Sequence, residues 1–240
     1  MQHKQTFCLT MKNHLFFIFI SITLLFNLNI EGQELNGDFD DVYGLNPILY
    51  NGRIYTDYYD NRVKGHQFLL EKKFYHGTVR INNQFFEKQE INYDVYKQKL
   101  LLKFKDYTLA LRLIEIPLEN VQSFSFSNKN FVISLMPDST QKIFQLIGKD
   151  VFNIYVFWSK KLNTTTSTSA FDYQFTDSKK EIWVNRKGKL EQISNNRSLI
   201  NLFDDAQGKK LKKWLKQSRI KIQKANNQQL LILAEYLYAL

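Results

Sequence analysis

Short apolar runs alternate with polar turns along most of the chain. Between residues 46 and 193 the runs have a period of two, and the turns recur about every 8–12 residues. A period of two sends successive side chains to opposite faces of a strand. Parallel strands need crossover connections of about a dozen residues or more, for which these turns leave no room. The pattern therefore predicts an antiparallel meander.

Asn82 and Asn83 stand between two such runs, at residues 78–81 and 84–87. Asn tolerates the positive φ angles that a two-residue hairpin turn needs, so this segment predicts a hairpin. Other turns are predicted at residues 97–99, 128–130 and 186–189. Other strands are predicted at residues 91–96, 100–104, 108–116, 121–126, 131–136, 142–147, 153–161, 171–176, 181–185 and 190–193.

The run at residues 121–126 alternates most regularly. Its period of two predicts that Phe124 and Phe126 lie on the face opposite Val121. Residues 162–170 interrupt the strand pattern with a tract of Asn, Thr and Ser. Such a tract predicts a polar loop, after which the β pattern resumes.

After Ser194 the apolar spacing changes to that of helices. Asp204 or Asp205 can cap the second helix, because a carboxylate accepts hydrogen bonds from free backbone N–H groups. Asn226 or Asn227 can cap the third in the same way. The residues at helical spacing are Leu199, Leu202, Phe203 and Ala206 in the first helix and Leu211, Trp214, Leu215 and Ser218 in the second; the predicted buried stripe of the third is Leu230, Leu233, Ala234 and Leu237.

Together these patterns predict a mainly β protein, an antiparallel meander folded as a sandwich or curved roll, with two or three C-terminal α-helices. We expect roughly ten to twelve strands, since turns recur about every 8–12 residues. The predicted organisation is a signal peptide at residues 1–32, a flexible segment at 33–45, a β-domain at 46–193 and a helical cap at 194–240 packed on the β-domain.

An apolar run at residues 15–30 follows Lys4 and Lys12 and precedes Gly32. This order of features is typical of a secretory signal. Its uninterrupted part, residues 15–26, is 12 residues long, shorter than the roughly 20 residues that span a bilayer as a helix. We therefore expect an exported protein, periplasmic or extracellular, with a retained anchor as the alternative.

The single cysteine, Cys8, lies before the apolar run. A lipid-modified signal needs a cysteine directly after that run, so we do not expect a lipoprotein. Removal of residues 1–32 would also remove Cys8 and leave a chain without disulfides. Its stability would then depend on its apolar core.

The formal net charge of the whole chain is +10. In an exported protein we expect no nucleic-acid partner. The excess of positive charge instead indicates anionic lipid headgroups or acidic polysaccharide as a partner. Basic residues gather on one face of the second predicted helix, where we expect a solvated face, with contact to an anionic membrane surface as the alternative. They are Lys209, Lys210, Lys212, Lys213, Lys216 and Arg219.

No pattern of residues predicts a catalytic, cofactor-binding or metal site. His66 and His76 are ten residues apart, which is not the spacing of a helical metal site or a zinc module. The acidic segment at residues 38–41 lacks the central Gly and the distal Glu of a calcium loop. Aromatic residues crowd residues 50–59 and 74–96, where we expect core and edge packing, with stacking on sugar rings or a peptide as the alternative.

The motif F-x-x-G-x-V-x-x-N-x-x-F occupies residues 74–85, and I-x-Y-D occupies residues 91–94. With the Lys-Gly turn at residues 185–190 and the basic helical end, the chain resembles a loose group of uncharacterised exported β-rich envelope proteins of Gram-negative bacteria. This resemblance implies an exported β-domain with a helical end. It implies no activity and no functional residues.

We therefore expect an exported envelope protein that is a non-enzymatic binding or structural module, with an unknown envelope protein or a glycan as its partner. The alternative is a secreted hydrolase of cell-wall or other polysaccharide, whose carboxylates would be dispersed in the sequence.

Overall fold

The structure is a computed structural model. It describes residues 45–56, 59, 62–149, 152–166, 170–186 and 188–240. The predicted signal at residues 1–32 and the segment at 33–44 lie outside the described residues, so the expectations for them stay predictions.

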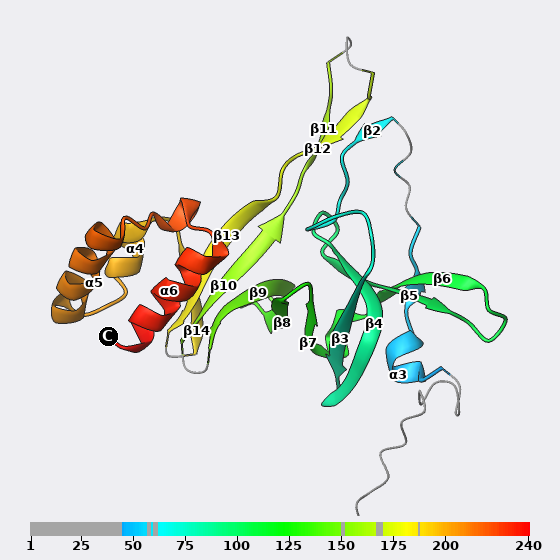
Figure 1. Ribbon diagram of the computed structural model, residues 1–240, viewed down its shortest axis with the longest axis horizontal. Helices are drawn as coiled ribbons and strands as arrows, with labels where there is room; N and C mark the ends of the chain where they lie inside the picture. Colours follow the sequence, from blue (N-terminus) through cyan, green and yellow to red (C-terminus); the bar gives the residue numbers. More distant parts are fainter. Residues whose placement is uncertain (1–44, 57–58, 60–61, 150–151, 167–169, 187) are drawn as a thin grey trace, which may run out of the picture. The chain divides into compact units, whose positions relative to one another are not determined.

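Eleven strands form one antiparallel sheet in the order β1-β6-β5-β4-β3-β7-β8-β9-β10-β13-β14 (Figure 1). Its strands are β1 (Arg53–Ile54), β3 (Tyr75–Ile81), β4 (Gln84–Asp94), β5 (Lys99–Lys105), β6 (Leu111–Ile116), β7 (Val121–Phe126), β8 (Lys129–Leu135), β9 (Gln141–Lys149), β10 (Phe152–Ser159), β13 (Lys179–Arg186) and β14 (Lys189–Ile193). A second sheet contains β11 (Leu162–Thr164), β12 (Tyr173–Phe175) and β2 (Val63–Lys64). The predicted mainly β, antiparallel fold is confirmed.

The connection from β6 to β7 shows that the sheet curls. In the sheet order these two strands are four strand spacings apart, which is about 19 Å in a flat sheet. The chain from Ile116 to Val121 could span at most about 18 Å if fully extended. The distance that this connection spans is shorter still, because Leu118–Asn120 form a 3₁₀ turn. The strands β6 to β7 therefore form a curved roll.

The inside of the roll is an apolar core drawn from β3 to β9. Phe124 and Phe131 stack with ring centroids 4.7 Å apart, and Tyr93 is fully buried. Burying a side chain of this size stabilises the fold by roughly 1.5–3 kcal/mol. The buried members are Leu49, Val79, Ile81, Phe86, Ile91, Tyr93, Val95, Leu100, Leu102, Ile114, Ile116, Val121, Phe124, Phe126, Phe131 and Ile143.

Val121 belongs to the same core as Phe124 and Phe126, so the predicted placement on opposite faces is wrong. Ile81 pairs with Val121 while Arg80 pairs with Ser123. One extra residue on β7 therefore forms a β-bulge, which turns Val121 back to the inner face.

The Asn82-Asn83 hairpin is confirmed, with φ of 49° and 66° at its two turn residues. Several strand boundaries differ from the prediction. β4 is one strand rather than two, because a register shift near Lys88, where φ is 56°, lets pairing with β3 continue. The turn predicted at 128–130 begins one residue earlier, and residues 162–164 of the predicted polar loop form β11.

Within the described residues the helices are α3 (Pro47–Tyr50), α4 (Asn196–Ile200), α5 (Asp205–Ser218) and α6 (Asn227–Tyr238), with 3₁₀ turns at Leu118–Asn120 and Ile222–Lys224. Asp204 caps α5, since its Oδ1 accepts a hydrogen bond from Gln207 N at 2.8 Å. Asn226 caps α6 through Gln229 N. Both caps were predicted, whereas α3 was not. The first predicted helix is shorter than expected, because α4 ends at Ile200 and leaves Leu202 and Phe203 in a turn.

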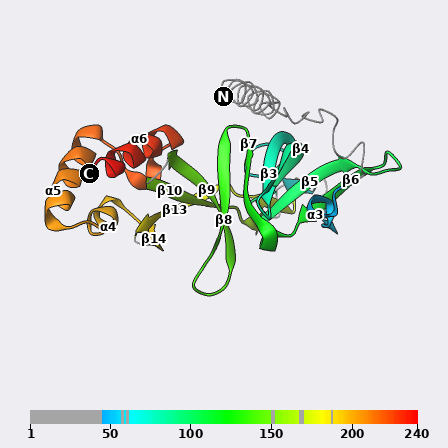
Figure 2. The ribbon, with the colours of Figure 1, turned by 90° about the horizontal axis from the view of Figure 1, so that it is seen from below.

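The C-terminal helices and the strands β9, β10, β13 and β14 share a second apolar core. α6 packs against β9 and β10, and the rings of Trp214 and Tyr236 stack 4.3 Å apart. Figure 2 shows these helices together beside β10 and β13. The lysines of α5 are exposed on the opposite side from Leu211 and Leu215. Among the described residues, no helix combines the length and apolarity needed to cross a membrane.

Candidate functional site

The loop between β5 and β6 exposes more apolar surface than its turn geometry requires. We call residues 106–111 the hairpin tip; Figures 1 and 2 both show it projecting from the sheet. Tyr107 is 93% exposed, Leu109 79% and Leu111 64%. Single exposed apolar residues are common on protein surfaces, whereas several within five positions indicate an interaction site.

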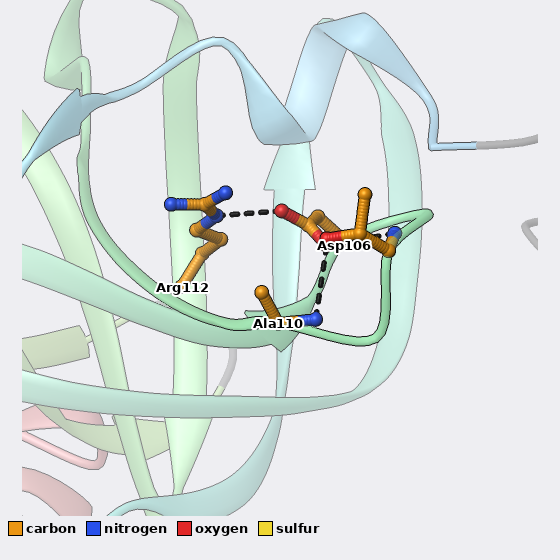
Figure 3. Close-up of polar contacts among 4 residues, drawn as sticks. Asp106, Ala110 and Arg112 are labelled. Carbon is orange, nitrogen blue, oxygen red and sulfur yellow. Dashed lines mark hydrogen bonds and ion pairs between the residues drawn. The ribbon is translucent and has the colours of Figure 1, made fainter.

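The side chain of Asp106 stabilises this tip through hydrogen bonds to neighbouring residues (Figure 3). Its Oδ1 accepts hydrogen bonds from Thr108 Oγ1 at 2.6 Å, Thr108 N at 2.9 Å and Ala110 N at 3.0 Å. Its Oδ2 accepts one from Arg112 Nε at 2.6 Å. The Thr108 hydroxyl, followed by Arg112 and the two amides, lowers the pKa of Asp106 to about 2. The carboxylate is therefore charged at neutral pH and holds the turn in one shape.

Leu109 has a φ of 63°, a left-handed conformation that is unfavourable for a bulky L-residue. The other non-glycine residues with positive φ in the described part of the chain are all polar: Asn82, Asn83, Lys88, Gln98, Ser127, Asn128, Ser139 and Arg219. A polar residue would therefore fit this backbone better than leucine does. The side chain of Leu109 is nevertheless apolar and exposed.

The flanks of the hairpin tip are basic. Lys105 is exposed at the end of β5, directly opposite Leu111 in the pairing of β5 and β6. The Nζ of Lys103 lies 2.8 Å from Glu90 Oε1, which offsets its charge. Arg112 is likewise offset by Asp106. The tip thus combines exposed apolar side chains with the positive charge of Lys105.

Asp94 is the buried carboxylate of the β4–β5 turn, and it serves the fold. Its Oδ2 accepts from Tyr55 Oη at 2.8 Å, and its Oδ1 from Tyr96 N at 2.9 Å and Lys97 N at 2.8 Å. Burial raises the pKa of Asp94, and these hydrogen bonds oppose the rise. Because Asp94 is 0% exposed and both its oxygens are engaged, no substrate can reach it.

His66 and His76, the histidines of the described residues, have different hydrogen-bond partners. His66 Nδ1 accepts a hydrogen bond from Phe68 N at 3.2 Å, and burial together with Lys160 lowers the pKa of His66. His76 is exposed, with Nδ1 3.4 Å from Lys88 O. Among the described residues no three His, Cys, Asp or Glu side chains gather to hold a metal ion. The acidic segment at residues 38–41 lies outside the described residues.

Of the aromatic segments noted in the sequence, several members fill cores: Tyr55, Phe86 and Tyr93 are buried. A different aromatic group forms across β9, β10 and β13, where Phe144 contacts the rings of Phe157 and Trp183 at 6.0 and 5.9 Å. Lys142 Nζ covers these two rings at 5.0 and 5.3 Å. This group is therefore packed on itself, and it leaves less free apolar surface than the hairpin tip.

The alternating sequence pattern predicted a strand where the structure has the hairpin tip. Leu109, Leu111 and Leu113 alternate with polar or small residues, which predicted a strand over 108–116. β6 begins only at Leu111, because Asp106 captures the amides of Thr108 and Ala110 that a strand would have paired. The combination of Asp106 and Thr108, a common turn-forming pair, was the available signal.

No protein-family model matches the chain, and neither does any curated protein or solved structure.

Proposed function

We propose that this chain is a non-enzymatic binding module of the cell envelope, and that the hairpin tip makes the contact. One observation supports this most: three exposed apolar side chains, Tyr107, Leu109 and Leu111, stand on a turn that hydrogen bonds hold rigid. A rigid tip loses little conformational entropy when it binds. An exposed apolar patch of this kind is typical of an interaction site.

Two cavities are each lined by two acidic residues, and in each cavity one of the two is already engaged within the fold, which supports binding over hydrolysis. A cavity of about 450 Å³ beside the β4–β5 turn contains Glu115 and Glu119. Glu115 Oε1 lies 3.5 Å from Lys99 Nζ, so it is held in an ion pair. A second cavity, of about 310 Å³, contains Asp204 and Asp205, and Asp204 is occupied as the cap of α5.

Site-specific photo-crosslinking in producing cells tests this function. A photoreactive phenylalanine analogue would replace Tyr107, and the matched control would replace Tyr238, which is 63% exposed in α6. We expect light-dependent adducts from position 107 and none from position 238. An absence of adducts at 107, or equal adducts at both positions, would show that the tip contacts nothing specific.

A further inference from the structure

We propose that the partner of the hairpin tip is an anionic lipid bilayer, and that Tyr107, Leu109 and Leu111 insert into its interface. This inference rests on the function proposed above and names the partner of the same site. The observations that support it are the projecting shape of the tip, the hydrogen bonds that four of its backbone N–H groups make within the loop and the charge at its base.

The turn between β5 and β6, which carries these apolar residues, projects from the sheet (Figures 1 and 2). A protein partner would have to supply a matching pocket, whereas a bilayer deforms around a projecting group. Tyr107 has the amphipathic ring that is enriched at the membrane interface. Leu109 and Leu111, both more than half exposed, supply acyl-chain contacts.

Insertion also requires that backbone polar groups have partners, because the hydrocarbon region offers none. The tip supplies them internally. Asp106 N donates to Ala110 O at 2.9 Å, and Leu109 N donates to Asp106 O at 2.8 Å. The amides of Thr108 and Ala110 donate to the carboxylate of Asp106. Four backbone N–H groups of residues 106–110 are thus bonded within the loop.

The charge at the base of the tip is complementary to an anionic headgroup layer. Lys105 is exposed directly beside the apolar residues. The negative charge of Asp106 would oppose binding, but Arg112 Nε lies 2.6 Å from its Oδ2 and offsets it. Without Lys4, Lys12 and Glu31 of the predicted signal, the formal net charge of +10 becomes +9, and this charge adds long-range attraction to the same surface.

Vesicle flotation of the exported chain, without the predicted signal at residues 1–32, tests the inference, with phosphatidylcholine vesicles that either contain or lack phosphatidylglycerol. We expect binding to the anionic vesicles, which weakens as salt is raised. Leu109→Asn keeps the left-handed turn, since Asn accepts positive φ, and should weaken binding at least about tenfold, the effect of one buried Leu. Lys105→Gln should weaken binding to anionic vesicles only.

The matched control is Leu135→Asn. Leu135 is 69% exposed at the end of β8, beside the β8–β9 turn. The Leu135→Asn variant should bind the anionic vesicles as tightly as the unaltered chain does. An equal loss of vesicle binding in Leu109→Asn and Leu135→Asn would overturn the inference, and so would undiminished binding by Leu109→Asn.

A second measurement locates the contact, since residues outside the tip could also bind vesicles. In Tyr107→Trp, the added indole should be quenched by brominated lipids beyond the background of the three native tryptophans. The same substitution at Tyr238 should add no quenching. An unquenched indole at position 107 would overturn the inference even if the chain floats with the vesicles.

The two proposals fail differently. If the crosslinker at position 107 captures a protein and anionic vesicles do not bind, the lipid inference is wrong and the binding function stands. If neither a lipid nor a protein is captured at position 107, both are wrong.

Discussion

Leu109 and Ser139 occupy the same left-handed position in two hairpin turns of one sheet, each with a φ of 63°. In the β5–β6 turn, Asp106 N donates to Ala110 O and Leu109 N to Asp106 O. In the β8–β9 turn, Met136 N donates to Thr140 O and Ser139 N to Met136 O. The fold therefore builds the same turn with a polar residue at this position, so folding does not require the leucine in the first turn.

We predict that Leu109→Asn stabilises the protein. A left-handed conformation costs an ordinary L-residue about 1–2 kcal/mol, and Asn pays less of this cost. For a chain of this size, a gain of about 1 kcal/mol raises the melting temperature by roughly 2–4 °C. Thermal unfolding followed by circular dichroism measures the shift. Ser139→Asn, which starts from a polar residue at the equivalent position, should change the melting temperature less. A lower melting temperature for Leu109→Asn would contradict the explanation.

The stability of the hairpin tip should depend on pH at the acid end. The pKa of Asp106 is lowered from the ordinary 3.8 to about 2 by its hydrogen bonds to Thr108 and Arg112. The stabilisation by its carboxylate is therefore fully present above pH 4 and is lost as the pH falls to about 2. Asp106→Asn should be less stable than the unaltered chain near neutral pH, and the two melting temperatures should converge over that acid range. A constant difference across the range would show that charge is not the cause.

Asp94 should be important for stability because it satisfies buried partners. Asp94→Ala would leave Tyr55 Oη and the amides of Tyr96 and Lys97 without their acceptor, at about 1–3 kcal/mol for each unsatisfied group. Asp94→Asn keeps one acceptor oxygen and avoids burying a charge, so it should cost less. Urea unfolding of both variants measures the difference. An equal loss in the two variants would mean that the carboxylate charge, and not its acceptor role, holds the turn.

The C-terminal helices should stabilise the fold through their apolar side. Leu233 is 1% exposed in the second core, and truncation of a packed leucine costs about 2–5 kcal/mol. Leu233→Ala should therefore lower the free energy of unfolding by that amount. The double variant Lys212→Ala with Lys213→Ala removes two exposed lysines of α5 and should change it little. Unchanged stability of Leu233→Ala in urea unfolding would contradict the packing seen here.

The sequence by itself determined the features that depend on a few neighbouring residues. The Asn82-Asn83 turn and the Asp204 cap of α5 follow from the conformational preferences and hydrogen-bonding groups of those side chains. The period of two and the later helical spacing likewise determined the mainly antiparallel β fold with C-terminal helices, since each element must bury one apolar face.

Only the tertiary structure decided which apolar residues are buried and which are free. The curl of the sheet follows from the short connection between β6 and β7, which are four strand spacings apart in the sheet order, and the bulge on β7 turns Val121 inward. Leu102 and Leu109 are both leucines in segments whose sequence pattern predicted a strand. Leu102 is nevertheless 0% exposed and Leu109 79% exposed. That difference arises because β5 pairs on both sides inside the roll, while residues 106–110 leave the sheet in a turn closed by Asp106.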